Sequence, residues 1–507
     1  MKDLNHYVQK IIASIENPRI PFLYHILLFA AAINLRNFLE IFSTRASISF
    51  QLFPSHYRIY FFAWVGMIIS LLHFTIFWID LALAIGIIVF FITREKIGNI
   101  LKAIFSFYFI LCITPIVDLI ISGGAGRNIA YAKPQNIVEF LLIPRILTPG
   151  MMVTSITALI LIFLYCKLKT HNWKKASLAS LLVYVLLLIG SVLPSILKTS
   201  HPVPIIRTLF ILFFIELAIV FYLIDKKIFL ALVKDVRWLR LLYFEAIFIL
   251  GIVLTSQPLL KVILANWDSF LLTLISIAFA WLSSLMFNNI EDEVIDKISN
   301  PQRPLVTEQI PANLYLKIAL SFVSLALVSG LAVNFQTFLF SFILVGSSFF
   351  YCLPPLRFKR IPLFSKIFIS FNCLILTMLG FIFAGQELLK FPSIFIWYFL
   401  IFVTLALNFI DLKDYAGDKV AGIPTLPVIL GLQKAKILAA TANLLAYGML
   451  AFIFLDFRLF LPSLILGVIQ FLLINRKTYQ EKPVLITHIV GIFLLLIYLS
   501  LSATGKI

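Results

Sequence analysis

Long apolar stretches alternate with short polar stretches along almost the whole chain. Apolar runs of about 18 or more residues recur, and each is long enough to cross the hydrocarbon layer of a membrane as an α-helix. Charged and turn-forming residues gather between these runs. The pattern predicts an all-α polytopic membrane protein.

Nine apolar segments follow one another from residue 238 onward, and we expect them to form a nine-helix transmembrane bundle. Their approximate limits are 238–258, 268–287, 314–333, 336–353, 366–384, 392–410, 436–455, 459–475 and 484–501. We assign this bundle to a domain that spans residues 226–507. The stretch Asp225 to Leu242, which leads into the bundle, is either an interfacial helix or a basic juxtamembrane loop.

Residues 1–225 are expected to form a separate transmembrane region of about six or seven helices. Its apolar runs lie near 22–42, 59–93, 103–122, 149–166, 176–197 and 206–224, and the run at 59–93 fits either two short spans interrupted by Asp80 or one span with an interfacial extension. Asp80, Asp118 and Glu216 lie in or near these runs, where ionisable residues are functional candidates by default. None has a partner at an interpretable spacing, so we interpret each as interfacial or internally paired. No motif predicts a function for this region.

The composition and the charge distribution define the setting of the bundle. Hydrophobic residues make up 62% of the 507 residues, charged residues make up 13%, and the net charge is +18. In a membrane protein such a charge indicates basic loops that face the cytoplasm and anionic lipid, so we expect membrane lipids as partners and no nucleic acid.

The basic residues also predict the orientation of the bundle. Fourteen Lys and Arg residues lie in or beside the loops after segments two, four, six and eight, against three in the other loops. The even-numbered loops are therefore predicted to be cytoplasmic and the C-terminus to be outside, with the cell membrane as the location. The side of the N-terminus is not predicted.

Two acidic clusters of the same spacing follow segments two and six. The first reads NNIEDEVIDK, from Asn288 to Lys297, and the second reads DLKDYAGDK, from Asp411 to Lys419. When they are aligned, Asn289, Asp292, Asp296 and Lys297 fall on Asp411, Asp414, Asp418 and Lys419. On a helix these positions share one face, so each cluster is expected to present a single acidic patch. Crowded carboxylates need a neutralising cation, and magnesium held together with a substrate phosphate is the economical choice.

Proline-stiffened loops place basic residues on the same side of the bundle. The sequence KISNPQRPL follows the first cluster and carries Arg303, while YCLPPLRFKR follows segment four and carries Tyr351, Arg357 and Lys359. Arginine beside a bound metal suits a diphosphate, because its planar fork donates two hydrogen bonds to phosphate oxygens. With an apolar tail between the helices, these parts predict a site for an amphiphile that bears a diphosphate.

These motifs resemble those of the UbiA-type intramembrane prenyltransferases, and the resemblance covers roughly residues 230–507. The family has an Asn-Asp-x-x-Asp-x-x-x-Asp cluster after the second helix, a loop with Tyr and Lys after the fourth, and an Asp-x-x-x-Asp cluster after the sixth. The resemblance implies a magnesium-dependent enzyme on the cytoplasmic face, with a prenyl diphosphate donor and a hydrophobic or aromatic acceptor. The residues so assigned are Asp292, Asp296, Asp414 and Asp418 as catalytic; Asn288, Asp292, Asp296, Asp411, Asp414 and Asp418 as metal ligands; and Arg303, Tyr351, Arg357, Lys359 and Lys413 as diphosphate ligands.

One departure from the family pattern keeps two alternatives open. Asn289 stands where the family usually has aspartate, which weakens one metal ligand, and Glu291 is the candidate to compensate for it. The chain is then either an active prenyltransferase or a catalytically silent member that binds lipid or acts as a scaffold. A multi-helix transporter is the third hypothesis, but it needs charged groups across the bilayer, and the nine segments offer only Glu245.

Overall fold

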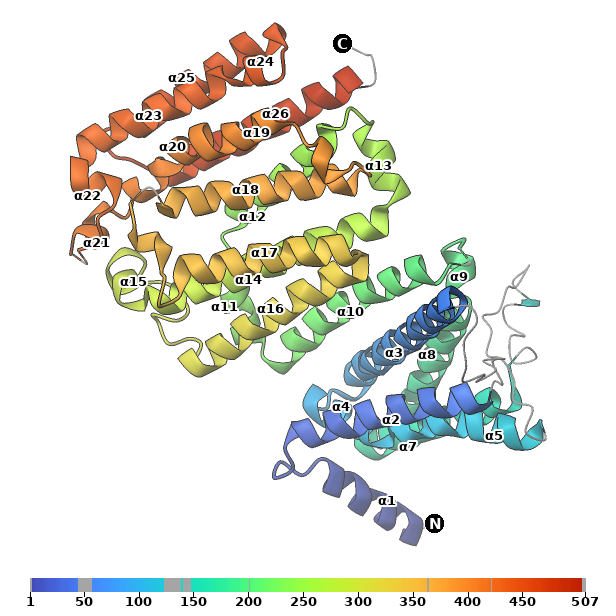
Figure 1. The fold of residues 1–507 in the computed structure, drawn as a ribbon. Coiled ribbons are helices and arrows are strands. Elements are labelled where there is room, and N and C mark those ends of the chain that lie inside the picture. Colours follow the sequence, from blue (N-terminus) through green and yellow to red (C-terminus); the bar gives the residue numbers. More distant parts are fainter. Residues whose placement is uncertain are drawn as a thin grey trace. The chain divides into compact units, whose positions relative to one another are not determined.

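The computed structural model describes residues 2–43, 57–122, 138–139, 147–199, 201–362, 364–420 and 422–503. The chain divides into two compact units, residues 1–226 and 227–507 (Figure 1). The secondary structure elements of the described residues are helices, which confirms the all-α fold. Fourteen of these helices are long and apolar enough to cross a membrane, six in the first unit and eight in the second.

The N-terminal unit is a bundle in which α3 packs against α10, α4 and α8, and α7 packs against α8 and α5. Its helices are α1 (Lys2–Ile15), α2 (Phe22–Ser43), α3 (Tyr57–Thr93), α4 (Ile97–Phe107), η1 (Tyr108–Cys112), α5 (Ile113–Ile121), α7 (Pro149–Thr170), α8 (Trp173–Ser191), α9 (Leu193–Ile196) and α10 (Pro202–Ile224). The run at 59–93 is one continuous helix, α3, because Asp80 lies inside its regular backbone without breaking it.

The C-terminal unit contains nine helical segments that follow the nine predicted segments. They are α12 (Trp238–Val253), α14 (Trp267–Glu291), α16 (Ala312–Val333), α17 (Phe335–Cys352), α18 (Phe364–Phe383), the composite helix Ser393–Leu412, α23 with α24 (Leu432–Ile453), η7 with α25 (Phe457–Ile474) and α26 (Glu481–Ala503). With 16 residues, α12 is the shortest of them. Of the stretch 225–242, Lys226–Asp235 forms α11, and a left-handed residue, Arg237, separates it from α12.

Small polar side chains join the helices of this unit. The Ser276 hydroxyl of α14 lies 2.7 Å from the Ala326 carbonyl oxygen of α16 and 2.7 Å from the Ser341 hydroxyl of α17. Ser and Thr are favoured between membrane helices because they allow close approach and hydrogen-bond across the interface. These contacts fix three neighbouring helices that run side by side in Figure 1.

Two facing glycines bring α12 and α18 into backbone contact. A Cβ atom added at Gly251 would lie 1.9 Å from the Thr377 carbonyl oxygen, and one added at Gly380 would lie 1.9 Å from the Phe248 carbonyl oxygen. The backbones of α12 and α18 can therefore approach this closely only because both contact positions are glycines without a side chain.

We expect Gly251→Ala and Gly380→Ala to lower the free energy of unfolding by about 1–3 kcal/mol or more, because the added methyl group overpacks a backbone contact. The measurement is thermal unfolding in detergent. Gly346→Ala on α17 is the matched control, since its Cβ would meet nothing within 4 Å. Equal midpoints for all three variants would contradict the close contact.

Candidate active site

The first acidic cluster is divided between two helices. The long helix α14 ends at Glu291, Asp292 adopts φ −102° and ψ 11°, and α15 (Glu293–Ser299) begins beyond it. The expectation of one helical face over residues 288–297 is therefore wrong. The interruption separates Asn288 and Asn289 on α14 from Asp296 on α15.

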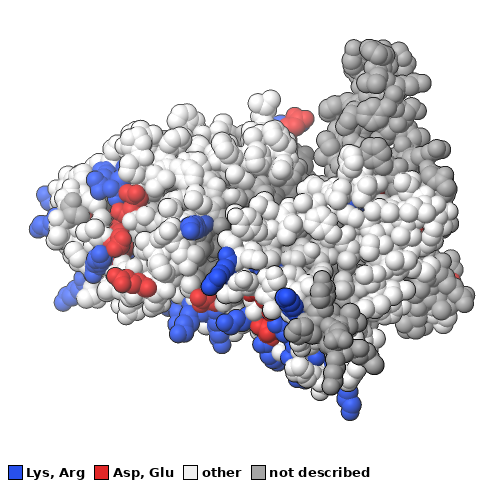
Figure 2. Space-filling model, turned by 90° about the horizontal axis from the view of Figure 1, so that it is seen from below, with Lys and Arg blue, Asp and Glu red and all other residues white. Residues whose placement is uncertain are grey.

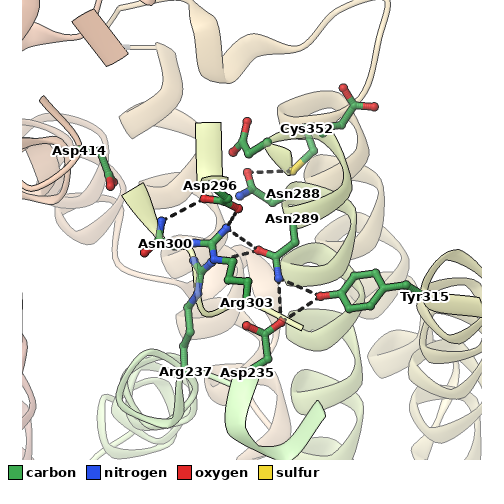
Figure 3. A network of polar contacts seen from close by, with 12 residues as sticks. Asp235, Arg237, Asn288, Asn289, Asp296, Asn300, Arg303, Tyr315, Cys352 and Asp414 are labelled. Carbon is green, nitrogen blue, oxygen red and sulfur yellow. Dashed lines mark hydrogen bonds and ion pairs between the residues drawn. The ribbon is translucent and has the colours of Figure 1, made fainter. Parts of the chain in front are cut away.

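The second cluster is divided in the same way. Asp411 lies on a 3₁₀ segment, η6 (Leu407–Leu412), and Asp418 lies on α21 (Tyr415–Val420). Helix α21 packs against α15, so the second half of each cluster meets the second half of the other. In Figure 3, Asp414 lies across from Asp296 and Asn300. The tertiary fold thus joins two clusters that are more than 100 residues apart in the sequence.

Asp292, Asp296 and Asp411 each lie close to a cationic side chain. Lys359 Nζ lies 2.7 Å from Asp292 Oδ1, and Lys366 Nζ lies 2.5 Å from Asp411 Oδ1. Arg303 donates to Asp296, which also accepts from Asn300 Nδ2 at 3.0 Å. Arg303 and Lys359 thus come from the proline-stiffened loops that were predicted to carry basic residues to the clusters, whereas Lys366 comes from helix α18.

Asn289 is the centre of a hydrogen-bond network (Figure 3). Its Oδ1 accepts from Arg237 Nη2 at 3.0 Å and from Arg303 Nη1 at 2.9 Å. Its Nδ2 donates to Asp235 Oδ2 and to Tyr315 Oη, both at 2.8 Å, and the Tyr315 hydroxyl donates to the same Asp235 oxygen at 2.9 Å. The side chain of Asn289 is 1% exposed. Every polar atom of this amide is therefore used within the protein.

This network explains why an amide occupies position 289. An aspartate there would face Asp235 with a second negative charge, whereas the amide donates to that carboxylate. Glu291 does not take over the role, because its side chain and its carbonyl oxygen both contact Arg357 Nη2, at 3.4 and 2.7 Å. The carboxylate that accompanies the first cluster is Asp235, from α11.

Further charged residues complete the site. Arg240 of α12 donates to Glu481 at the start of α26, and Lys413 Nζ lies 3.0 Å from the same carboxylate. In the sequence, Arg237 and Arg240 belong to the stretch Asp225 to Leu242, which was interpreted as an interfacial helix or a basic juxtamembrane loop, and Lys366 counts among the basic residues that predict the orientation. Asp235 lies in the same stretch, and no motif marks Asp235, Tyr315 or Glu481 as part of the site.

A cavity of about 780 Å³ opens beside the clusters and continues between the helices. Asn288, Asp292, Asp296, Asp411, Asp414 and Asp418 all line it, together with Arg303, Tyr351, Lys359 and Lys413. Arg357 is not among the lining residues, since it is directed to Glu291. Deeper in, the walls are apolar and aromatic, with residues such as Ile247, Leu344, Leu376 and Phe399. Figure 2 shows the charged side chains gathered at the end of this unit that carries α15 and α21, at the left of the view.

The second cluster retains uncompensated negative charge. Burial, and then the charges of Asp411 and Asp414, raise the pKa of Asp418 from 3.8 to about 7. Burial likewise raises the pKa of Asp414, although Lys413 acts in the opposite direction from 3.9 Å. Asp418 accepts one hydrogen bond, from Thr425 Oγ1 at 3.2 Å. This half of the site therefore favours an additional cation.

A divalent ion fits this donor set only together with further oxygens. Among the described residues, no three Asp, Glu, His or Cys side chains converge closely enough to hold a metal ion. Hard divalent ions take six or more oxygen ligands, and magnesium commonly completes its shell with phosphate oxygens. The raised pKa values of Asp414 and Asp418 show where such a charge lowers the electrostatic cost.

Comparison with known proteins gives consistent matches for the C-terminal unit. Residues 246–497 match the model of the UbiA prenyltransferase family. Digeranylgeranylglyceryl phosphate synthase of Methanothermobacter thermautotrophicus is 29% identical over 220 residues, which is 42% of this chain and 76% of the relative. Homogentisate phytyltransferase 1 of Arabidopsis thaliana is 30% identical over 173 residues, 32% of this chain and 44% of the relative. The solved UbiA homolog from Archaeoglobus fulgidus bound to DMAPP and Mg²⁺ aligns with a TM-score of 0.44 and 21% identity, over 54% of this chain and 99% of that one.

The fold and the cavity define a polytopic integral membrane protein with a charged mouth and an apolar interior in its C-terminal half. That half belongs to the UbiA prenyltransferase family. The resemblance carried by the two acidic clusters and the Tyr351 loop is confirmed, and with it the class of enzyme, a prenyltransferase.

We expect Asn289→Asp to lower the free energy of unfolding by about 1–3 kcal/mol, because the substitution removes two donated hydrogen bonds and adds a charge beside Asp235. Thermal unfolding in detergent measures this loss. In the Asn289→Asp, Asp235→Asn double variant the new amide can donate to the new carboxylate, so we expect most of the stability to return. If the stability of the double variant stays as low as that of Asn289→Asp, the hydrogen bond between residues 289 and 235 is not the cause of the loss.

We expect Asp418→Asn to stabilise the protein when metal and substrate are absent and the pH is high. The folded environment raises the pKa of this carboxyl group from 3.8 to about 7, so the native state binds more protons than the unfolded state between these pH values. Native stability therefore falls as the pH rises across this interval. The variant avoids this loss, about 1.4 kcal/mol for each pH unit of the interval.

The measurement is thermal unfolding with chelator from pH 4 to pH 8. The stability difference between Asp418→Asn and the unsubstituted protein should grow with pH and level off above about 7. Glu293→Gln, a change in the same region at a more exposed carboxylate, is the control. A difference that is constant with pH would contradict the raised pKa.

Proposed function

We propose that the C-terminal unit transfers a prenyl group from a prenyl diphosphate to a lipophilic or aromatic acceptor within the membrane. The observation that carries this proposal is that both acidic clusters line the mouth of the same cavity, with apolar side chains behind them. An amphiphile with a diphosphate head and an isoprenoid tail matches this division. The names of the relatives include both a glyceryl phosphate lipid synthase and a homogentisate transferase, so both acceptor classes stay within the proposal.

The charged mouth is suited to hold the diphosphate. Arg303, Lys359 and Lys413 line the cavity with donors that can bind phosphate oxygens, and each already lies beside a carboxylate that fixes its position. Tyr351 also lines the cavity and adds a hydroxyl group. Arg357 supports the site from outside, because it holds the end of α14 at Glu291.

The chemistry follows from the position of the head group. The bond between the allylic carbon and the diphosphate oxygen breaks, and its electron pair leaves with the diphosphate. The cations of the mouth stabilise the charge that develops on this leaving group. The acceptor then forms a bond to the allylic carbon and loses a proton. Aromatic faces in the cavity, such as Tyr398, Phe409 and Tyr447, can stabilise the carbocation.

Magnesium is the proposed cofactor. Asn288, Asp292, Asp296, Asp411, Asp414 and Asp418 are the residues that would hold it together with the diphosphate. When bound, the ion supplies positive charge that lowers the barrier to loss of the diphosphate. Asn289 is not available as a ligand, since its oxygen already accepts two hydrogen bonds.

The cytoplasmic face of the cell membrane is the proposed location of the reaction. The basic residues in the loops around α15 and α21 support this side, because cytoplasmic loops of membrane proteins carry an excess of Lys and Arg.

The experiment that tests the proposal uses the full-length protein in nanodiscs. Radiolabelled geranylgeranyl or farnesyl diphosphate is incubated with it, magnesium and an extract of lipids and quinone precursors, with and without chelator. Magnesium-dependent appearance of a prenylated product supports the enzyme and identifies the acceptor. Magnesium-dependent donor binding without transfer would favour the catalytically silent alternative, and absence of donor binding would overturn the site.

We expect Asp292→Ala and Asp418→Ala each to reduce prenyl transfer by at least about 100-fold, because each removes charge that stabilises the bound ion and leaving group. Label transfer and the amount of protein in the membrane are measured together. Glu293→Ala is the matched control, since Glu293 belongs to the same cluster but pairs with Lys297 outside the cavity. Full activity in either aspartate variant would remove that residue from the site.

A further inference from the structure

The N-terminal unit contains two carboxyl groups with buried oxygens that lack a hydrogen-bond partner, unlike its other buried carboxylates. Asp80 of α3 is 6% exposed, and both of its carboxyl oxygens are buried without a hydrogen-bond partner. Glu216 of α10 has one buried oxygen, Oε2, in the same condition. Helices α3 and α10 pack against each other, and the two carboxyl groups lie close enough to interact electrostatically.

Other buried carboxylates of this unit are satisfied by donors. Asp118 accepts hydrogen bonds from the Thr148 hydroxyl and from Gly150 N, the latter at 2.8 Å. Glu40 pairs with Arg36 at 3.2 Å. Asp118 is therefore internally paired, one of the two alternatives that its sequence position left open. Asp80 and Glu216 instead carry carboxyl oxygens without a hydrogen-bond partner, on two helices that pack against each other.

Among the described residues, no cationic side chain pairs with the buried oxygens of these two carboxyl groups. Tyr108 of η1 interacts with both carboxyl groups, but its hydroxyl donates to the Trp78 carbonyl oxygen. Several charged or titratable groups on the other elements packed against α3 are engaged elsewhere. Arg36 contacts Glu40 and Asn37, and Lys102 contacts the carbonyl oxygens of Asn17 and Ile20. Tyr165 and Lys169 contact Glu16. On α8, Lys174 and Lys175 lie in the first turn, at the end of the helix.

Two adjacent carboxylates inside a membrane helix bundle cannot both stay ionised. An unpaired buried charge is costly in itself, and a second like charge beside it adds repulsion. A proton removes both costs, because a carboxylic acid donates a hydrogen bond to the neighbouring carboxylate and the two groups then titrate as a pair. A metal ion needs more ligands than two side chains, and the described residues contain no third Asp, Glu, His or Cys to complete such a set.

We propose that Asp80 and Glu216 form a proton-binding site within the membrane, in which one proton is shared between the two carboxyl groups and is taken up and released as a unit. The site belongs to the N-terminal unit and does not depend on prenyl transfer. Exchange of a proton at such a depth is the chemistry by which membrane bundles couple proton uptake to function.

The test is labelling of the full-length protein in nanodiscs with dicyclohexylcarbodiimide, which reacts with protonated carboxyl groups in apolar surroundings. Peptide mass spectrometry locates the adduct. We expect modification at Asp80 or Glu216 that declines as the pH rises, and none at Asp118, whose oxygens accept from other donors. Absence of modification at both positions at every pH would overturn the proposal.

Variants and ions define the site further. Asp80→Asn with Glu216→Gln should abolish the adduct, whereas Asp118→Asn, a change at another buried carboxylate of the same unit, should leave it unchanged. The infrared band of protonated carboxyl groups, recorded on the unsubstituted protein, gives a readout that needs no variant, and its absence at low pH would contradict the shared proton. Protection from labelling by Na⁺ but not by choline at constant pH would assign the pair to a metal ion and overturn the proton site.

Discussion

The structure depends on one constraint, that a carboxylate removed from water must meet a compensating group. The C-terminal unit meets it with ion pairs: Asp292, Asp296 and Asp411 each lie against a Lys or Arg side chain. In the N-terminal unit Asp118 receives hydrogen bonds from neutral donors. Where the compensation is incomplete, as at Asp414 and Asp418, the site has capacity for a ligand with positive charge. The candidate active site therefore lies where buried carboxylates lack sufficient compensating charge from the protein itself.

The cavity combines a rigid wall with a mouth made of short elements. Helices α12 and α18, in backbone contact at Gly251 and Gly380, both contribute lining residues, among them Tyr243 and Asn372. The mouth is built instead from α15, α21 and the turns beside them, each held by a few polar contacts. The apolar part of the cavity is thus bounded by tightly packed long helices, whereas its charged mouth is built from short elements.

The lengths of the apolar stretches allowed most of the membrane-spanning helices to be predicted correctly from the sequence. The last span was expected at 484–501 and is observed at Glu481–Ala503. Such a helix is predictable because it corresponds to one uninterrupted apolar stretch of the sequence. The acidic clusters were found for a similar reason, since their spacing is local. The interruption of the helix at Asp292 and the contacts of Asn289 with Asp235 and Tyr315 were not predictable in this way. They join residues 26 and 54 positions away, and no periodic pattern marks such pairs.

The hydrogen bonds of Asn289 also constrain the history of the chain. If the aspartate usual in the family was the ancestral residue at 289, an acidic residue at 235 was disfavoured for as long as that aspartate remained. Relatives that retain aspartate at the equivalent of 289 should accordingly lack an acidic residue at the equivalent of 235, so that the two positions evolve as one epistatic unit.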